Sequence, residues 1–181
     1  EIKRVKFPSS QINLKSFSGS YISSPHDEKI NFNKDEDFTV SFWMEPQATG
    51  SDGGFDNTEK RYIIAKSSTK VVTPQSASVD QSTTTSEPQF PFEIYLMSQS
   101  LYFDISDGDA TNSIIGEVTN SAGTATGSSH ILCQKSASRM EMWYNGTRIA
   151  SSSFTLAKQT RNTADLFIGS RGQRDTSLDT E

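Results

Sequence analysis

The sequence predicts an all-β domain, a sandwich or barrel built from many short strands. Short apolar runs alternate with clusters of Gly, Ser, Asn and Asp along the chain of 181 residues, a spacing typical of antiparallel sheets joined by turns. Phe is the commonest aromatic residue, with 11 copies, and aromatic residues favour strands. Long runs of Ala, Leu, Glu and Lys at helical spacing are missing. The length suffices for one domain with a sizeable core.

Ten segments have the alternation and composition of strands. They are, in chain order, Ser20–Ser24, Asp37–Pro46, Arg61–Ser68, Pro91–Met97, Ser100–Ser106, Asn112–Thr119, Ser128–Gln134, Arg139–Asn145, Thr147–Phe154 and Asp165–Ser170. Two polar insertions, Ala48–Lys60 and Thr73–Gln89, are expected to be loops. The chain starts in polar sequence without Met, so we expect a domain cut from a longer protein. Residues 1–16 are an N-terminal extension or strand, and residues 17–181 are the domain.

The fourth and fifth strands can be paired in register as a hairpin. A two-residue turn at Ser98-Gln99 would place six apolar residues on one face, as the pairs Leu96–Leu101, Ile94–Phe103 and Phe92–Ile105. The other face would then carry the pairs Tyr95–Tyr102 and Glu93–Asp104. A slip of one residue would exchange the two faces, so this agreement supports the register.

The opposed carboxylates of Glu93 and Asp104 should repel each other. A nearby Lys or Arg, a metal ion or a ligand rich in hydroxyl donors must offset that repulsion. With Tyr95 and Tyr102, the two acids supply what an exposed sugar site needs: an aromatic platform and acceptors for hydroxyl groups. The alternative is that a long loop covers this face and that the tyrosines pack beneath it.

A second hairpin is centred on Asn145-Gly146, because a type I′ turn requires positive φ at both residues. The expected pairs are Tyr144–Thr147, Trp143–Arg148 and Met142–Ile149. The apolar face, formed by Met140, Met142, Tyr144 and Ile149, is assigned to the core. Trp143 and Arg148 share the other face, where the guanidinium can lie on the indole, and both join the candidate sugar site. Trp43 points away from the core and is expected to pack at the rim.

Composition excludes several classes of partner. The formal net charge is -5 and no stripe of Lys and Arg is present, so nucleic acid and anionic membranes are poor partners. No apolar run approaches the roughly 18 residues that a membrane span needs. The single cysteine, Cys133, rules out an internal disulfide. We interpret it as a buried, inert thiol in a strand.

Three motifs in this order resemble the concanavalin A-like lectin/glucanase superfamily, in particular its laminin-G-like or pentraxin-like branch. They are an FT-SFW strand at Phe38–Trp43, a YxNG hairpin at Tyr144–Gly146 and a lyIGs strand at Leu166–Ser170. The resemblance covers about residues 17–172. It implies an antiparallel two-sheet jelly-roll β-sandwich, and it is more specific for fold than for function.

In that family the first strand pairs with a strand that follows the lyIGs segment. Nothing after Ser170 has strand character, so the domain is expected to lack its closing strand. Because an unpaired edge invites association, the segment Ile2–Leu14 or a strand from another protein chain is expected to fill the gap. The first route gives a self-contained monomer and the second an obligate assembly.

Glucanase members of the superfamily carry catalytic carboxylates spaced as Glu-x-Asp-x-x-Glu on one strand. No strand here has that spacing, so we expect no catalytic residues and no enzyme. The pair Glu93–Asp104 keeps a glycosidase open as the weaker alternative, because opposed strand positions lie about 5 Å apart at Cβ, which suits a retaining pair. His26 and His130 fit no Ser/His/Asp set.

Two loops carry candidate calcium ligands, since many relatives bind calcium at the sandwich rim and oxygen-rich glycine loops suit this ion. The candidates are Asp52, Asp56, Asn57, Asp107, Asp109 and Asn112. The alternative is that these residues are solvated turn residues. No cofactor is certain.

The sequence thus favours a non-catalytic, lectin-like module of a larger extracellular, cell-surface or virion-surface protein. Its expected partner is a glycan or surface polysaccharide, with other protein chains possible only where they complete the sheet. The ligand-binding candidates are Tyr95, Tyr102, Glu93, Asp104, Trp143 and Arg148. The alternative is a structural or protein-interaction domain without a sugar site.

Overall fold

A computed structural model gives the fold of the chain. It describes residues 21–44, 60–67, 89–97, 100–118 and 128–171, and the statements below concern these residues. The insertions Ala48–Lys60 and Thr73–Gln89 lie almost wholly outside them, as does the segment Ile2–Leu14. No helix in the described part is long and apolar enough to cross a membrane.

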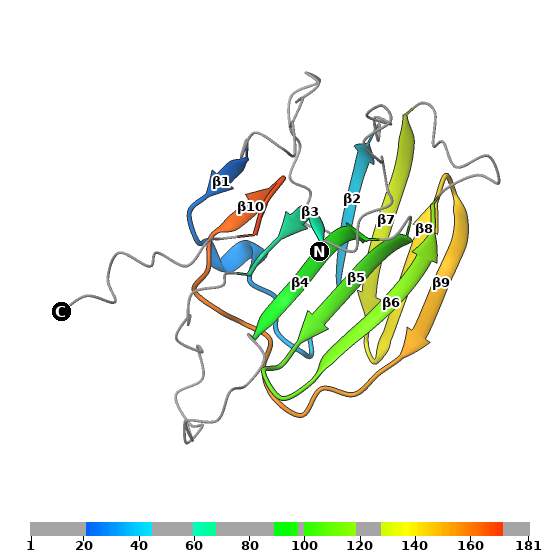
Figure 1. The fold of residues 1–181 in the computed structure, drawn as a ribbon. Coiled ribbons are helices and arrows are strands. Elements are labelled where there is room, and N and C mark those ends of the chain that lie inside the picture. The colour runs from blue at the N-terminus through cyan, green and yellow to red at the C-terminus, as the bar shows by residue number, and fades with distance from the viewer. Residues whose placement is uncertain (1–20, 45–59, 68–88, 98–99, 119–127, 172–181) are drawn as a thin grey trace.

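The described residues form two antiparallel sheets that face each other (Figure 1). The six-stranded sheet has the order β1 (Ile22–Ser24), β10 (Leu166–Ile168), β3 (Arg61–Ala65), β4 (Phe90–Met97), β5 (Ser100–Ser106) and β6 (Thr111–Glu117). The four-stranded sheet has the order β2 (Phe38–Met44), β7 (Ser129–Ser136), β8 (Arg139–Tyr144) and β9 (Thr147–Ser153). A 3-10 turn, η1 (Glu28–Ile30), is the sole helical element of the described part. Each predicted strand overlaps an observed one, so the all-β sandwich is confirmed.

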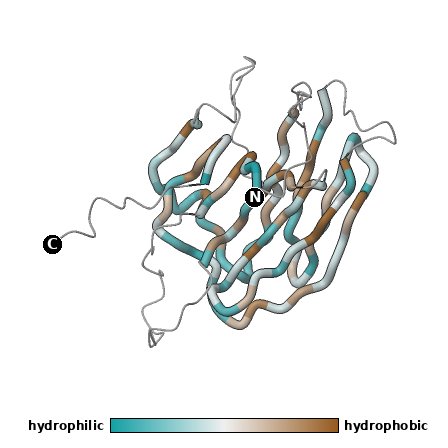
Figure 2. The backbone as a smooth tube through the Cα atoms, viewed as in Figure 1, coloured by the Kyte–Doolittle hydropathy of each residue, from teal (hydrophilic) through white to brown (hydrophobic). Residues whose placement is uncertain are grey.

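The core lies between the inner faces of the two sheets. Alternate residues along the strands point inward because the side-chain period of a strand is two, and Figure 2 shows hydrophobic positions recurring along both sheets. Phe38 of β2 and Phe103 of β5 meet edge to face, with ring centroids 6.2 Å apart, and so join the sheets. Gly116 of β6 allows a close approach to β9, because a Cβ there would lie 2.4 Å from Ile149 Cδ1.

The register predicted for the β4–β5 hairpin is largely confirmed. Leu96–Leu101, Ile94–Phe103, Tyr95–Tyr102 and Glu93–Asp104 are all paired. The register then shifts between Phe90 and Glu93, and Phe90 pairs with Ser106. This bulge interrupts the expected pairing of Phe92 with Ile105, although both residues are buried in the core. A bulge inserts one extra residue, so the residues beyond it change face.

The β8–β9 hairpin has the predicted turn. Asn145 has φ 48° and Gly146 has φ 80°, as a type I′ turn requires. Tyr144 pairs with Thr147 and Trp143 with Arg148. A bulge between Met142 and Trp143 then pairs Met142 with Ala150, so the expected Met142–Ile149 pair is wrong.

The predicted gap at the edge of the six-stranded sheet stays a prediction, because the segment Ile2–Leu14 and the residues after Arg171 lie outside the described residues. The lyIGs segment itself, β10, pairs with β1 on one side and with β3 on the other. In the described part of the chain, β1 is therefore the edge strand of its sheet and no gap separates it from β10. A strand of only three residues presents little unpaired backbone, which is how natural sheets limit association at an edge.

Candidate functional site

A row of aromatic side chains crosses the outer face of the six-stranded sheet. Tyr62, Tyr95 and Tyr102 occupy paired positions on β3, β4 and β5, and Ile115 of β6 continues the row. The Tyr95 and Tyr102 rings stack with centroids 4.9 Å apart and planes 7° apart. Tyr62 lies 5.6 Å from Tyr95 in a tilted contact. The row ends in an exposed residue, because Ile115 is 53% accessible.

Glu93 lies beside this row and is held by a salt bridge. Arg171 Nε lies 2.7 Å from Glu93 Oε1, and the Ser67 hydroxyl donates to the same oxygen. The Arg171 guanidinium also lies over the rings of Tyr62 and Phe90, at 5.7 and 6.0 Å from their centroids. Arg171 follows β10, and the β10–β3 ladder brings it across to β4.

Asp104 is held less completely. The Tyr95 hydroxyl donates to Asp104 Oδ2 at 2.9 Å, and Lys60 Nζ lies 3.8 Å from the same oxygen. Lys60 also sits 4.3 Å from the Tyr95 ring centroid, a cation–π contact. The second oxygen, Oδ1, is buried and makes no regular hydrogen bond among the described residues. Asp104 is only 2% accessible, and the Ser113 hydroxyl is a further group close to its carboxyl.

Burial governs the ionisation of both acids. Burial raises the pKa of Glu93, and Arg171 and the Ser67 hydroxyl oppose that rise. Burial likewise raises the pKa of Asp104, opposed by the nearby Ser113 and Tyr95 hydroxyls and by Lys60. Burial and the Asp104 carboxylate also raise the pKa of Tyr95, so its hydroxyl keeps the proton that it donates.

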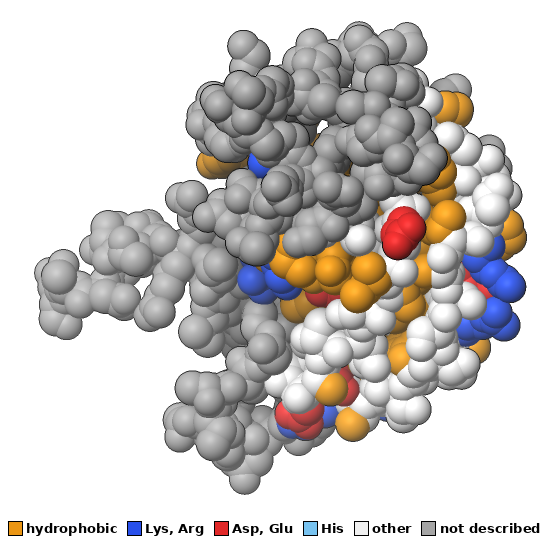
Figure 3. Space-filling view, turned by 45° about the vertical axis from the view of Figure 1, so that its right-hand side comes forward, with side chains coloured by type: hydrophobic (Ala, Val, Ile, Leu, Met, Phe, Trp, Pro, Cys, Tyr) orange, Lys and Arg blue, Asp and Glu red, His pale blue; other side chains and the backbone are white. Residues whose placement is uncertain are grey.

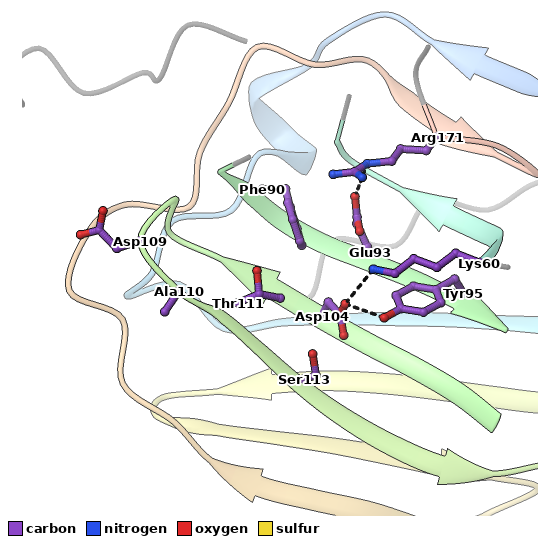
Figure 4. Close-up of a pocket in the computed structure, with 10 residues that line it drawn as sticks. All are labelled: Lys60, Phe90, Glu93, Tyr95, Asp104, Asp109, Ala110, Thr111, Ser113 and Arg171. Carbon is purple, nitrogen blue, oxygen red and sulfur yellow. Dashed lines mark hydrogen bonds and ion pairs between the residues drawn. The ribbon is translucent and has the colours of Figure 1, made fainter. Parts of the chain in front are cut away.

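These groups surround a cavity of about 330 Å³ (Figure 4), near the lower end of the range for small-molecule sites. The lining residues are Lys60, Phe90, Glu93, Tyr95, Asp104, Asp109, Ala110, Thr111, Ser113 and Arg171. Figure 4 shows Glu93, Asp104, Lys60 and Arg171 converging from different elements. Phe90 joins them because the bulge in β4 turns it away from the core. Figure 3 shows hydrophobic side chains gathered beside acidic and basic ones on this side of the molecule.

The structure corrects the prediction of an exposed patch. Tyr95, Tyr102, Glu93 and Asp104 share one face, as predicted. However, Tyr95, Glu93 and Asp104 are at most 3% accessible, and only Tyr102 is partly exposed. Two cations, Arg171 and Lys60, offset the repulsion between the acids.

Several residues of the site were missed from the sequence. Lys60 and Arg171 lie just outside strands, so no alternation assigns them to a face. Tyr62 precedes a register shift between β3 and β4, and a bulge cannot be located from the hydrophobic pattern alone. The signal in the sequence was the opposed acid pair, because a nearby Lys or Arg was one of the three ways predicted to offset its repulsion.

Trp143 and Arg148 do not belong to this cavity. They lie on β8 and β9 of the opposite sheet, facing outward. Arg148 lies 6.0 Å from the Trp143 ring centroid, so the predicted cation–π contact is present. Trp43 is on the same outer face and is 69% accessible, so the expected packing at the rim is wrong. The six ligand-binding candidates therefore divide between two faces.

The calcium prediction finds no support in the described loop. Asp107 accepts hydrogen bonds from four backbone N–H groups, those of Asp109, Ala110, Ala157 and Lys158. Burial works to raise the pKa of Asp107, but these four donors lower it overall. Asp109 forms a salt bridge with Lys158 at 2.7 Å. Asp107 therefore ties two loops together.

Asn112 occupies a strand position opposite Ile105 rather than a loop. No group of three or more His, Cys, Asp or Glu residues in the described part could hold a metal ion. Asp52, Asp56 and Asn57 lie outside the described residues.

Comparison with protein families identifies the fold. Residues 16–180 match the model of the concanavalin A-like lectin/glucanases superfamily. The chain belongs to this family. No curated protein matches the sequence.

Solved structures show the same fold in toxin binding domains. The binding domain of Paraclostridial mosquitocidal protein 1 has a TM-score of 0.64 and 20% identity, over 89% of this chain and 35% of that one. A structure of botulinum neurotoxin type C, described as interacting with two ganglioside molecules, has a TM-score of 0.56 and 16% identity, over 87% and 33%. The botulinum neurotoxin serotype C1 binding domain has a TM-score of 0.53 and 14% identity, over 81% and 30%. The chain thus spans about a third of each.

Proposed function

We propose that this domain is a non-catalytic carbohydrate-recognition module and that a glycan occupies the cavity on the six-stranded sheet. The observation that carries the proposal is Asp104 Oδ1, a buried carboxylate oxygen without a regular partner among the described residues, in the wall of that cavity. Leaving such an acceptor unpaired is costly. A sugar hydroxyl is a donor of suitable size and polarity.

The other lining groups suit the same ligand. The exposed residues Thr111 and Ser113 bring hydroxyls to the cavity wall, and Lys60 brings an ammonium group on a side chain that is 41% accessible. Tyr102 does not line the cavity, but it is partly exposed and stacked on the lining residue Tyr95, so its position is fixed before a ligand arrives. A fixed aromatic side chain and a few placed polar groups are the usual composition of a small-ligand site.

The comparisons support a binding role for the domain. The family includes lectins by its description, and one structure of the same fold is described as interacting with gangliosides. The chain covers only part of such proteins. We therefore also propose that it is one domain of a larger extracellular, cell-surface or virion-surface protein.

Catalysis is the weaker candidate because Glu93 is already engaged. Its Oε1 accepts from Ser67 and Arg171, which leaves it poorly placed to attack a sugar or activate water. The observation in favour of a glycosidase is the cross-strand pair of carboxyl groups with raised pKa values. We therefore expect no release of reducing ends from β-glucans or other polysaccharides.

A glycan array followed by calorimetry on the best ligand tests the proposal. Asp104→Asn should weaken binding about tenfold or more, because it turns an ionic acceptor into an amide. Tyr102→Ala should cost about 1–3 kcal/mol of binding free energy, the scale of one large side chain. Glu117→Gln, an exposed position at the end of β6 beyond the cavity, is the matched control.

Two results would count against this function. The first is an array with no glycan above background, which would favour the structural or protein-interaction alternative. The second is glycan binding that both Asp104→Asn and Tyr102→Ala leave unchanged. Reducing-end release abolished by Glu93→Gln would instead establish a glycosidase.

A further inference from the structure

Both tryptophans of the chain project from the outer face of the four-stranded sheet. Trp43 of β2 is 69% accessible, and Trp143 of β8 is partly exposed. Tryptophan carries a large apolar surface that is normally buried on folding. Packing of the core therefore does not explain why two such residues lie on one solvent-facing sheet.

The register places these side chains in adjoining rows. Trp43 pairs with His130, and their rings lie 5.1 Å apart. The Ser41 hydroxyl and His130 Nε2, 2.8 Å apart, are hydrogen-bonded, which fixes the imidazole beside the indole. One row further along β7, Leu132 pairs with Trp143, which in turn pairs with Arg148 on β9.

The same face carries two arginines, Arg139 and Arg148, and the carboxylates of Glu141 and Asp37. Glu141 Oε1 lies 3.0 Å from Arg139 Nε and 3.0 Å from Arg148 Nη1, so one carboxylate serves two guanidinium groups. The two arginine side chains are 51% and 46% accessible, whereas that of Glu141 is 20% accessible. Each guanidinium has five donors in a planar fork, so most of them remain available to an acidic ligand.

We propose that this face, the Trp43–Arg148 surface, is a second binding surface and that its ligand is an acidic oligosaccharide. A sugar ring stacks on Trp43, and an acid group on the ligand pairs with Arg148 or Arg139. This proposal does not depend on ligand binding in the cavity on the six-stranded sheet.

The dimensions of the face favour a chain of several sugars. Trp43 and Arg148 lie three strands apart, and neighbouring strands are about 4.8 Å apart, so roughly 14 Å separates them across the sheet. One sugar ring cannot reach both. The ligand therefore carries its acid group at a distance from the ring that stacks on Trp43.

The composition favours a glycan over a protein or a membrane. The polar residues Ser41 and His130 adjoin the aromatic ones, whereas the centre of a protein interface is depleted of charge and well packed. A membrane surface requires a cluster of several basic residues, whereas this face carries two arginines and the chain has a formal net charge of -5.

The test uses sialylated, uronate-containing and sulfated oligosaccharides, each paired with its neutral counterpart. At low salt, at least one acidic member should bind about tenfold or more tightly than its neutral counterpart, since charge-assisted hydrogen bonds are the strong ones. Binding should weaken with added salt. Arg148→Gln should reduce the preference for the acidic member, and Trp43→Ala should weaken binding of that member about tenfold or more. Thr39→Ala, on the same strand and face as Trp43, is the control that should change nothing.

The two sites can be told apart in the same experiment. Asp104→Asn should leave acidic-glycan binding intact, and Trp43→Ala should leave binding in the cavity intact. Iodide quenching of Trp43 fluorescence in a Trp143→Phe variant should fall when the acidic ligand is added. Absence of any acidic preference, or acidic-glycan binding that Trp43→Ala leaves unchanged, would overturn this second surface. Binding of Trp43-dependent protein or vesicle probes without glycan binding would overturn it as well.

Discussion

Each sheet carries an arginine–glutamate pair on its outer face, and the two pairs differ in their surroundings. Arg171 Nε lies 2.7 Å from Glu93, and Arg148 Nη1 lies 3.0 Å from Glu141. The side chains of the first pair are 19% and 1% accessible, and those of the second are 46% and 20% accessible. Similar residues at similar distances thus occupy a buried network on one sheet and a solvated surface on the other.

The comparison shows that burial determines how much a charged pair matters for stability. A buried carboxylate must keep a partner, because removal of the partner leaves an uncompensated charge. A solvated pair contributes little to stability, because water and salt screen it. The charges on the six-stranded sheet are therefore committed to the fold, except for Asp104 Oδ1. The charged side chains on the four-stranded sheet remain accessible to a ligand.

The largest expected effect comes from removing one arginine from each pair. Arg171→Met should lower the free energy of unfolding by about 3–5 kcal/mol at neutral pH, because Glu93 stays buried without a cation. Arg148→Met should change it by less than about 1 kcal/mol. Urea denaturation of the two variants measures the contrast.

A second substitution shows whether the buried charge causes the loss. Glu93→Gln added to Arg171→Met should restore much of the stability, because the uncompensated carboxylate is gone. Equal losses in the two single variants, or no recovery in the double variant, would mean that burial does not distinguish the two pairs.

A smaller expected effect is a difference between the two faces in how folding stability depends on pH. Burial raises the pKa of Asp104 above its ordinary value of 3.8, so the folded protein binds this proton more tightly than the unfolded chain. The stabilisation is present below pH 3.8 and is lost as pH rises through the raised pKa. Asp104→Asn removes this titration and should gain stability relative to the parent as pH rises from 4 to 7.

Unfolding free energies at several pH values measure that difference. Glu141→Gln on the solvated face is the control, and its difference from the parent should vary much less over the same range. A constant difference for Asp104→Asn would show that this carboxyl titrates alike in the folded and unfolded chain.

The smallest expected effects concern the turns that hold the four-stranded face. Gly146 has φ 80° and Ala137 has φ 49°, and only glycine adopts such angles at no steric cost. Gly146→Ala should destabilise the domain by about 1 kcal/mol, and Ala137→Gly should stabilise it by a few tenths to about 1 kcal/mol. Thermal unfolding measures both, and shifts of the same sign would contradict the turn geometry.

The sequence by itself determined the strands and, next to the turns, the hairpin registers. A strand has a period of two, so the apolar set of β4 and β5 could face the core in one register only, and this placed Tyr95 with Tyr102 and Glu93 with Asp104. Asn145-Gly146 fixed the β8–β9 turn, because few other dipeptides accept positive φ twice. These features are local, and local sterics act on neighbouring residues alone.

Tertiary structure alone decided which sheet each hairpin joined and what covered its outer face. Trp143 and Tyr95 look equally exposed in the alternation, yet they lie on opposite sides of the sandwich. Arg171 reaches Glu93 across 78 positions of sequence (171 minus 93), a contact that depends on the β10–β3 and β3–β4 ladders. Bulges in β4 and β8 shifted the registers beyond the predicted pairs. Burial and long-range pairing depend on the whole packed chain, so no short stretch of sequence encodes them.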